Sequence, residues 1–342
     1  MPALDTITIK GFRSIASIEN LKLEAINVLI GPTGSGKSNF IEALSLLGHI
    51  FEGTFDSYVN RSGYVENILH HGIKVATAIE LELYFSRDCS SIHVLIKPED
   101  TGRLAYEVDT DPRSMLHLQM CQYINSVRTY HFNDMMELLQ RATSICDNYC
   151  LLRDASNLAA FLYYLRARHQ TSYSLIRRAV QLVAPFFDDF LLEPQKLNPN
   201  KIRLEWKHKG SDAYFDTSSL SDGTLRFMAL ATLFLQPNEY RPSVILVDEL
   251  ELGLHPYAIT ILASLIKSSL ARTQVIVATQ SPLLLDSFKP EDVLVADRVD
   301  GGTQLTRLQS EKLNVWLENY SLGQLWEKNE LGGRPGAEKT HG

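Results

Sequence analysis

Hydrophobic and polar residues alternate in several short runs in the first third of the chain, and this period of two is typical of β-strands. The runs are Ile7-Thr8-Ile9-Lys10, VATAIELELYF at 75–85, SIHVLIK at 91–97 and RLAYEVD at 103–109. A longer apolar stretch from Leu21 to Ile30 predicts one more strand, which leads into a glycine-rich loop. We therefore expect a β-rich lobe at about residues 51–130.

Helical spacing appears in two other parts of the chain. After Lys37, apolar residues recur three and four positions apart through Ile50, which predicts a helix directly after the loop. The same spacing recurs in NLAAFLYYLRARH and SYSLIRRAVQLVAPFF, so we expect a helical insertion over residues 134–187. For residues 188–216 we expect antiparallel strands.

From residue 220 onward, predicted helices alternate with strands at Val244–Val247, Gln274–Ala278 and Val293–Ala296. This order is typical of the second half of a doubly wound α/β sheet. No linker rich in proline, glycine or serine interrupts the chain, so we expect residues 1–342 to form a single domain with the middle segments as insertions.

Composition and charge narrow the function classes. The chain is 45% hydrophobic and 21% charged, with a net charge of −7, which argues mildly against a non-specific nucleic-acid binder but leaves room for a local basic patch. No segment approaches the roughly 18 apolar residues of a membrane span. The N-terminus MPALDTITIK lacks the basic start of a secretory signal, so we expect a cytoplasmic protein without membrane contact.

The loop after the first predicted parallel strand reads GPTGSGKS at 31–38 and fits the pattern GxxxxGK[ST] through Gly31, Gly36, Lys37 and Ser38. Glycine lets the backbone curl around a phosphate, and the following helix offers its N–H groups and positive dipole end. Lys37 can reach the terminal phosphate oxygens of ATP, and the Ser38 hydroxyl can coordinate Mg²⁺.

An acidic pair follows the predicted strand Val244–Val247. Ligands bind at the carboxyl ends of strands in open α/β sheets, where Asp248 can hold the Mg²⁺ that Ser38 also touches. Glu249 is placed to orient and deprotonate an attacking water. A third motif, LSDGTLR at 220–226, predicts a helix that begins with Ser221 as cap and Gly223 in the first turn, which is a second anion site.

Taken in order, these three motifs and VIVATQSPLLLD at 275–286 resemble the heads of ABC-type P-loop ATPases in the branch of RecF, the SMC proteins and the OLD ATPases. The resemblance is greatest to bacterial predicted AAA-family ATPases without a coiled coil, and it includes TYHFNDM at 129–135 and LWEKNELGGRP at 325–335. It implies an α/β head with a mixed, largely parallel sheet, and a lobe at 188–335 that carries the signature, Walker B and switch motifs.

The resemblance also implies roles for single residues. The loop Gly31-Pro32-Thr33-Gly34-Ser35-Gly36-Lys37-Ser38 and Asn39 would bind ATP, Ser38 and Asp248 would hold Mg²⁺, and Lys37, Glu249 and Gln280 would act in hydrolysis. Ser221 and Gly223 would contact the γ-phosphate held by a second subunit, which implies a head-to-head homodimer around two ATP molecules. Arg13 matches a position near the nucleotide in related heads.

The chain departs from the ABC pattern at two places. The switch position, commonly histidine, is Gln280, which can donate a hydrogen bond but cannot become cationic near neutral pH. The glutamine that usually follows a mid-domain strand is not obvious; His131 or Asn133 could replace it, or both could be packing and turn residues. His255 could approach the dimer interface or begin a helix beside Pro256.

Two functions remain open at this point. The first is a Mg²⁺-dependent ATPase that dimerises with ATP and serves a DNA-related process or antiviral defence. The second is an ATP-gated scaffold or sensor, in which hydrolysis is slow and a partner effector such as a nuclease or toxin is controlled. Gln280 and the lack of a coiled-coil pattern favour the second, and the set Lys37, Asp248 and Glu249 favours the first.

Overall fold

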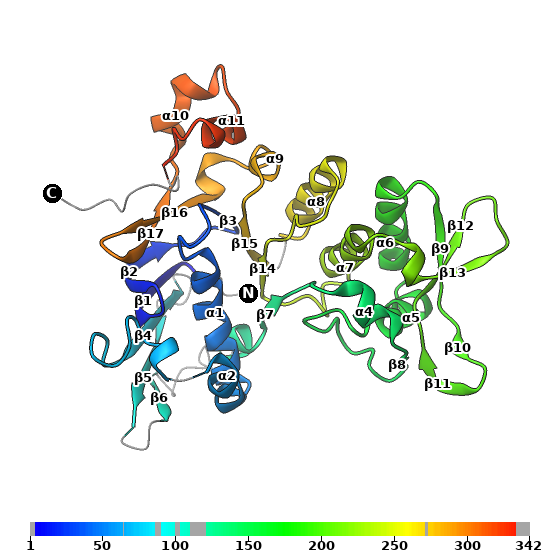
Figure 1. The fold of residues 1–342 in the computed structure, drawn as a ribbon, viewed down its shortest axis with the longest axis horizontal. Helices are drawn as coiled ribbons and strands as arrows, with labels where there is room; N and C mark the ends of the chain where they lie inside the picture. Colours follow the sequence, from blue (N-terminus) through cyan, green and yellow to red (C-terminus); the bar gives the residue numbers. More distant parts are fainter. Residues whose placement is uncertain are drawn as a thin grey trace. The chain divides into compact units, whose positions relative to one another are not determined.

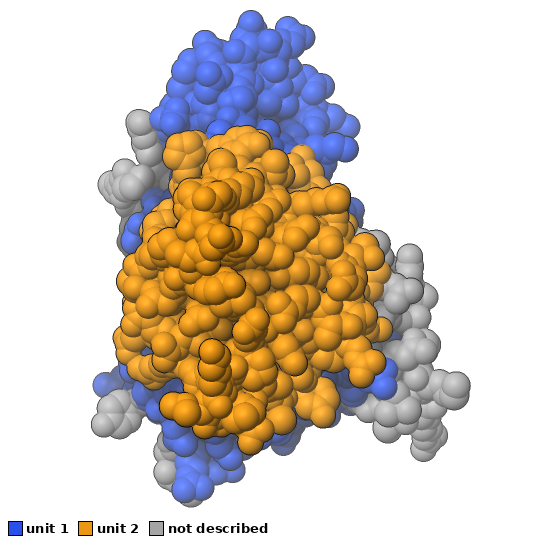
Figure 2. Space-filling model, turned by 90° about the vertical axis from the view of Figure 1, so that its right-hand side faces the viewer, with its two compact units in different colours: residues 1–129, 243–249, 274–342 blue, residues 130–242, 250–273 orange. Residues whose placement is uncertain are grey.

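The computed structural model describes residues 4–63, 65–85, 90–99, 103–109, 121–270 and 273–332 (Figure 1). The chain divides into two compact units, coloured separately in Figure 2. Unit 1 contains residues 1–129, 243–249 and 274–342, and unit 2 contains residues 130–242 and 250–273. The chain therefore passes between the units after residues 129, 242, 249 and 273. The expectation of a single domain over the whole chain stays a prediction.

The central sheet of unit 1 has six strands in the order β17-β16-β3-β15-β14-β7. They are β3 (Ile26–Ile30), β7 (Val127–Tyr130), β14 (Val244–Asp248), β15 (Gln274–Thr279), β16 (Val293–Val299) and β17 (Gly302–Arg307). Strands β16, β3, β15 and β14 pair in parallel, and β17 pairs antiparallel with β16. Every residue of β3 and β15 is buried, as expected for parallel strands that are covered on both faces. The predicted mixed, largely parallel sheet is confirmed.

The β-rich lobe of unit 1 is an antiparallel sheet in the order β2-β1-β4-β5-β6. Its strands are β1 (Thr6–Phe12), β2 (Ile15–Lys22), β4 (Ile79–Phe85), β5 (Ser90–Pro98) and β6 (Leu104–Asp109). The prediction of one strand from Leu21 to Ile30 is wrong, because β2 and β3 belong to different sheets. At the start of β3, Asn27 Oδ1 accepts from Glu24 N–H at 3.0 Å and its Nδ2 donates to Glu24 O at 2.7 Å. This buried side chain stabilises the turn between β2 and β3, which the apolar pattern of the sequence does not indicate.

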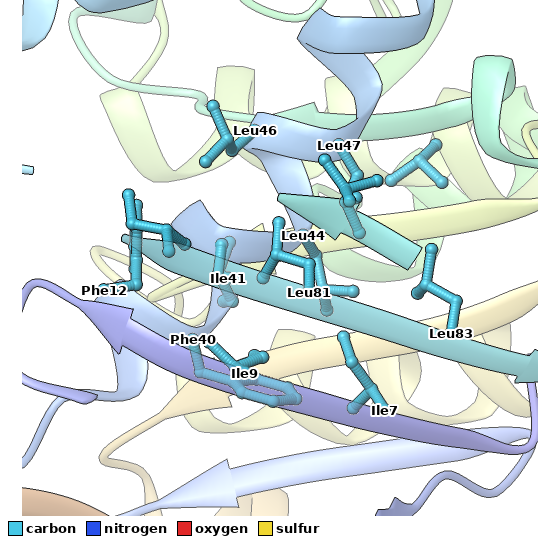
Figure 3. Packing of buried hydrophobic residues seen from close by; sticks show 14 of the residues in the cluster. Ile7, Ile9, Phe12, Phe40, Ile41, Leu44, Leu46, Leu47, Leu81 and Leu83 are labelled. Carbon is cyan, nitrogen blue, oxygen red and sulfur yellow. The ribbon is translucent and has the colours of Figure 1, made fainter. Parts of the chain in front are cut away.

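Helix α1 (Lys37–Phe51) begins where the spacing predicted and packs on this lobe. Figure 3 shows Phe40, Ile41 and Leu44 of α1 beside Ile9 of β1 and Leu81 of β4, all of them buried. This cluster ties the helix that follows the glycine loop to the antiparallel sheet.

The first part of the predicted β-rich segment 51–130 is helical instead. Helix α2 (Phe55–Ser62) and the 3-10 turn η1 (Val65–Asn67) precede β4. In α2 the buried residues Phe55 and Tyr58 are three positions apart, which is the spacing of one helix face. The remaining elements of unit 1 are α9 (Pro282–Leu285), η4 (Pro290–Asp292), α10 (Ser310–Leu317) and α11 (Leu322–Glu327). Residues 333–335 of the predicted C-terminal lobe lie outside the described residues.

Unit 2 is mainly helical, with two small antiparallel sheets in the orders β10-β11-β8 and β13-β12-β9. Its helices are α4 (Met135–Gln140), α5 (Leu158–Arg168), α6 (Gln170–Val183), α7 (Asp222–Leu235) and α8 (Pro256–Ser268), with η3 (Thr217–Ser219) before α7. Its strands are β8 (Thr143–Ser144), β9 (Phe187–Leu191), β10 (Pro194–Gln195), β11 (Asn198–Ile202), β12 (Glu205–His208) and β13 (Tyr214–Asp216). The antiparallel strands predicted within 188–216 are confirmed, whereas the segment 134–187 also contains β8 and an irregular stretch before α5.

The motifs are divided between the two units. Unit 1 carries the glycine loop and the acidic pair, and unit 2 carries LSDGTLR at the start of α7. Within the described ranges, no helix has both the length and the apolar character that a bilayer crossing requires.

A buried glutamine joins three segments of unit 1 at the start of β15. Gln274 Nε2 donates to Leu4 O at 3.0 Å and Glu24 O at 2.9 Å, and its Oε1 accepts from Tyr123 Oη at 2.8 Å. We expect Gln274→Ala to lower the free energy of unfolding by about 2–4 kcal/mol, because Leu4 O and the Tyr123 hydroxyl each lose a buried hydrogen bond and Glu24 O loses one of its two side-chain donors. Urea denaturation checks this. Gln304→Ala, on the exposed side of β17, is the matched control, and an equal loss in both variants would contradict the prediction.

Candidate functional site

Strands β16 and β17 pack closely against the glycine loop between β3 and α1. Gly34 and Gly36 have φ angles of +83° and +97°, which favour glycine. A Cβ on Gly36 would lie 1.9 Å from Thr303 Oγ1, and one on Gly31 would lie 2.4 Å from Ala296 O. Strands β16 and β17 therefore require glycine at these two positions, independently of any ligand.

The open side of the loop has the properties of an anion site. Lys37 is 6% exposed, and its Nζ donates to Gly31 O at 2.7 Å and Pro32 O at 3.0 Å. Helix α1 has neither a side-chain cap nor an acidic residue in its first turn, so the positive end of its dipole lies at the loop. Thr33, Gly34 and Ser38 are exposed, and the Oγ of buried Ser35 has no hydrogen-bond partner within the described ranges. The loop fits the phosphates of a nucleotide.

A small hydroxyl network supports the loop, and the sequence analysis missed two of its members. Ser14 Oγ and Thr303 Oγ1 are 2.7 Å apart, and Asn39 Nδ2 donates to Ser14 Oγ at 2.7 Å. The side chain of Asn39 is therefore engaged with Ser14, which follows Arg13 in the chain. No spacing in the sequence links Ser14 with Thr303, which lies 289 positions away.

Arg13 lies on the turn between β1 and β2 with a φ of +46°. Its guanidinium lies 5.5 Å from the centre of the Phe12 ring, with Nη2 4.0 Å from a carboxylate oxygen of Glu42 on α1. Arg13 O is 2.7 Å from Nδ1 of the buried His70, and Arg13 N–H donates to Ile68 O at 2.9 Å. The turn is thus held by several contacts, with the guanidinium beside the helix that follows the glycine loop.

The acidic pair lies at the carboxyl end of β14. Asp248 is partly exposed, but its Oδ1 is buried and has no hydrogen-bond partner among the residues that the structure describes. A buried oxygen without a partner costs about 1–3 kcal/mol. Carboxylate and hydroxyl oxygens are the ligands that Mg²⁺ prefers, so Asp248 and Ser38 fit a magnesium site.

Glu249 has an unusual backbone conformation. Its φ is +48°, which is uncommon for a residue with a side chain, while its N–H donates to Ala278 O at 2.9 Å. Gln280 Nε2 donates to Glu249 Oε1 at 3.1 Å. The structure thus brings together the two residues that the sequence placed 31 positions apart, both exposed at the ends of neighbouring strands. Backbone strain of this kind clusters at functional sites.

The third motif begins α7 in unit 2. Ser221 is the N-cap, and its Oγ accepts from Thr224 N–H at 3.2 Å, as predicted. A Cβ on Gly223 would lie 2.1 Å from Gly253 O, so the first turn of α7 is in close contact with the loop that follows the acidic pair. His255 caps α8, since its Nδ1 accepts from Tyr257 N–H at 3.2 Å; this favours the helix-start interpretation over a role at a dimer interface.

The segment TYHFNDM contacts α7 through an arginine that the sequence analysis did not single out. Arg226 Nη2 donates to Asn133 Oδ1 at 3.1 Å, so Asn133 has a packing role within unit 2. His131 N–H donates to Arg153 O at 2.9 Å. An arginine inside the apolar run DGTLRFMALATLFL was the available signal for burial, but its partners are far away in the sequence.

The chain also matches the model of a known protein family. A family model described as "AAA domain, putative AbiEii toxin, Type IV TA system" matches residues 26–89 and 122–286, which is more than half of the chain. The match spans the glycine loop, LSDGTLR and the acidic pair.

The similar curated proteins belong to the SMC and RecF groups. The chain is 37% identical over 70 residues to "Chromosome partition protein Smc" of Mycolicibacterium paratuberculosis, which covers 20% of this chain and 6% of that protein. It is 39% identical over 70 residues to "DNA replication and repair protein RecF" of Yersinia enterocolitica, covering 20% of this chain and 19% of that one. It is 27% identical over 117 residues to RecF of Aliivibrio fischeri, with 33% of each chain covered. The matches thus span a third or less of these relatives.

Similar solved structures are heads of Smc proteins. One, bound to the C-winged helix domain of ScpA, has a TM-score of 0.67 at 18% identity and covers 92% of this chain and 100% of that chain. Another, from Pyrococcus furiosus and bound to the C-terminal domain of ScpA, has a TM-score of 0.66 at 16% identity and covers 93% and 99%. The motifs, the fold and the family model agree: the chain belongs to this AAA-domain family, in the RecF and SMC branch of the ABC-type P-loop ATPases.

Proposed function

We propose that this protein binds ATP with Mg²⁺ and hydrolyses it to ADP and phosphate. The observation that carries the proposal is the register of three parallel strands. In that register Thr279 pairs with Ile30 and Ala278 pairs with Asp248, so β3, β15 and β14 end together. Gly31, Gln280 and Glu249 are the next residues after these strand ends. The phosphate loop, the switch glutamine and the acidic pair therefore begin at one edge of one sheet.

The residues at this edge supply the parts that phosphoryl transfer needs. The glycine loop and Lys37 bind the phosphates, and Lys37 exchanges its two carbonyl acceptors for phosphate oxygens. Glu249 accepts a proton from water as the water oxygen bonds to the γ-phosphorus and the bond to the ADP oxygen breaks. Gln280 holds the Glu249 carboxylate and offers its amide to the water or the γ-phosphate. When bound, Mg²⁺ at Ser38 and Asp248 neutralises the charge that develops on the phosphates.

The proposal extends to a homodimer. The start of α7 exposes Ser221 at the positive end of the helix dipole, which supports binding of a γ-phosphate held by a second copy. In the head-to-head arrangement that the family resemblance suggests, each copy contributes one such helix end. Hydrolysis then separates the copies, because the shared γ-phosphate is lost.

The process that ATP serves is proposed from the relatives. Chromosome partition and DNA replication and repair appear in their names, so a DNA-related process is our first candidate. The second candidate is an ATP-gated scaffold in which hydrolysis is slow and an effector such as a nuclease or toxin is controlled; the uncharged Gln280 at the switch position favours it. Phosphate release by the purified chain, with and without DNA, separates the two candidates: stimulation by DNA favours the first.

Replacing the proposed base tests the reaction. We expect Glu249→Gln to lower kcat by at least about 100-fold, because a neutral amide cannot accept the proton of the attacking water. The variant should also accumulate as an ATP-bound dimer in light scattering. Glu311→Gln, at an exposed glutamate of α10, is the matched control and should keep kcat within about threefold. Equal turnover by wild type and Glu249→Gln would disprove the assigned base.

The proposed metal site makes a separate prediction. We expect chelation of Mg²⁺ to weaken binding of a fluorescent ATP analogue to the wild type by about tenfold, equivalent to about 1.4 kcal/mol. Asp248→Asn should bind the analogue at the weaker level with or without Mg²⁺, since its amide is a poor metal ligand. Asp297→Asn on β16 serves as the control and should respond to Mg²⁺ as the wild type does. A full Mg²⁺ response in Asp248→Asn would refute this assignment.

A further inference from the structure

One buried cation in unit 2 is held by neutral oxygen atoms alone in the contacts that the structure records. Arg226 is 4% exposed; its Nε donates to Phe132 O at 2.9 Å, its Nη1 to Leu252 O at 2.8 Å and its Nη2 to Asn133 Oδ1 at 3.1 Å. A buried charge is costly unless its hydrogen bonds are satisfied. Three directional bonds therefore keep this side chain in one conformation, with its donors turned toward two loops of its own unit.

The acceptors of Arg226 lie on two chain segments that have just entered unit 2. Phe132 and Asn133 follow β7, after the chain enters unit 2 at residue 130. Leu252 follows β14 and is three positions after Glu249, where the chain enters unit 2 at residue 250. Strands β7 and β14 are neighbours in the six-stranded sheet. The Arg226 side chain thus joins the segment that follows β7 to the segment that follows β14. Each of its acceptors lies within three residues of the point where the chain enters unit 2.

A second contact joins α7 to the same loop. The Gly223 position lies so close to Gly253 that an added Cβ would be 2.1 Å from Gly253 O. Arg226 and Gly223 are three positions apart on α7, so both contacts come from one face of its first turns. The loop between Glu249 and α8 is therefore attached at Leu252 and Gly253 to the helix that Ser221 begins.

We propose that Arg226 is a positioning residue for ATP hydrolysis. It fixes the loop Leu250–Leu254 to the start of α7, so that Glu249 and the Ser221 end of the helix respond together to bound ATP. The inference rests on the proposed function. Arg226 does not bind phosphate itself, because its donors are buried and committed to the two loops.

Unit 2 offers a matched control for a purely structural role. Arg241, like Arg226, donates three hydrogen bonds, in its case all to backbone carbonyls: those of Ser269 at 3.2 Å, Phe234 at 3.0 Å and Gln236 at 2.8 Å. It lies beyond the other end of α7 and has no recorded contact with Leu250–Leu254. Loss of either guanidinium leaves backbone carbonyls without a donor, so both losses should destabilise the protein to a similar degree.

The test compares Arg226→Gln, Arg226→Lys and Arg241→Gln in the full chain, with urea denaturation, ATP affinity, kcat and hydrogen exchange measured on each. We expect Arg226→Gln to lower kcat by about tenfold or more with ATP affinity within about threefold of wild type, a split that marks a loss specific to the reacting state. Arg226→Lys should recover part of kcat. Arg241→Gln should lose similar stability and keep kcat within about twofold.

Hydrogen exchange gives a readout that does not need turnover. In Arg226→Lys, peptides that cover Leu250–Leu254 and Ser221–Arg226 should exchange faster together, while in Arg241→Gln they should match the wild type. If Arg226→Gln fails to fold, Asn133→Ala, which removes one of the three bonds, should still lower kcat about two- to threefold at unchanged ATP affinity.

Two results would overturn the inference. The first is a wild-type kcat in Arg226→Gln, or in Asn133→Ala if Arg226→Gln does not fold. The second is a fall of kcat in Arg241→Gln that equals the fall in Arg226→Gln. A wild type without turnover would instead contradict the proposed function. The exchange experiment would then decide whether Arg226 couples the two segments, and independent exchange of the two peptides would refute the coupling.

Discussion

The candidate site depends on the register between β15 and its two parallel neighbours. Because β3, β15 and β14 end together, the glycine loop, Gln280 and the acidic pair start at one edge of the sheet. Strand pairing alone brings these starting points together, and no contact between the loops is required. The buried side chain of Gln274 contributes to this arrangement, since it ties the start of β15 to Leu4, Glu24 and Tyr123. A slip of one residue in this register would turn every side chain of β15 to the opposite face.

The conformation of the glycine loop depends on the strands packed against it as well as on its own sequence. Thr303 of β17 and Ala296 of β16 leave no space for a Cβ at Gly36 and Gly31. Ser14 bonds with both Thr303 and Asn39, so the turn of the antiparallel lobe and the edge of the parallel sheet meet at the loop. The glycines are therefore needed for the close approach of the protein's own strands, and they would also allow the close approach of a phosphate.

Local patterns in the sequence predicted much of this. The apolar spacing located α1, the alternating runs located β4 to β6, and the acidic pair was expected at the end of β14, where the structure has it. The failures have physical causes. The division between β2 and β3 depends on Asn27 in a run that is otherwise apolar, and α2 is amphipathic over too few residues to stand out beside the strands that follow. The partners of Ser14 and Arg226 lie 289 and up to 94 positions away, and single-sequence patterns carry no information on such pairs.

Conformational strain and burial point to the same few residues. Glu249 keeps a positive φ while bonded to Gln280, and Asp248 keeps a buried oxygen without a recorded partner. Both are costs to the folded state that a bound nucleotide and metal would offset.

The most direct test is a crystal structure of the full chain with Mg²⁺ and a non-hydrolysable ATP analogue. The account predicts Lys37 Nζ on phosphate oxygens instead of on Gly31 O and Pro32 O, Mg²⁺ on Ser38 and Asp248, and a water on Glu249 in line with the γ-phosphate. Nucleotide bound away from the glycine loop, or with Asp248 and Glu249 turned away from its phosphates, would contradict it.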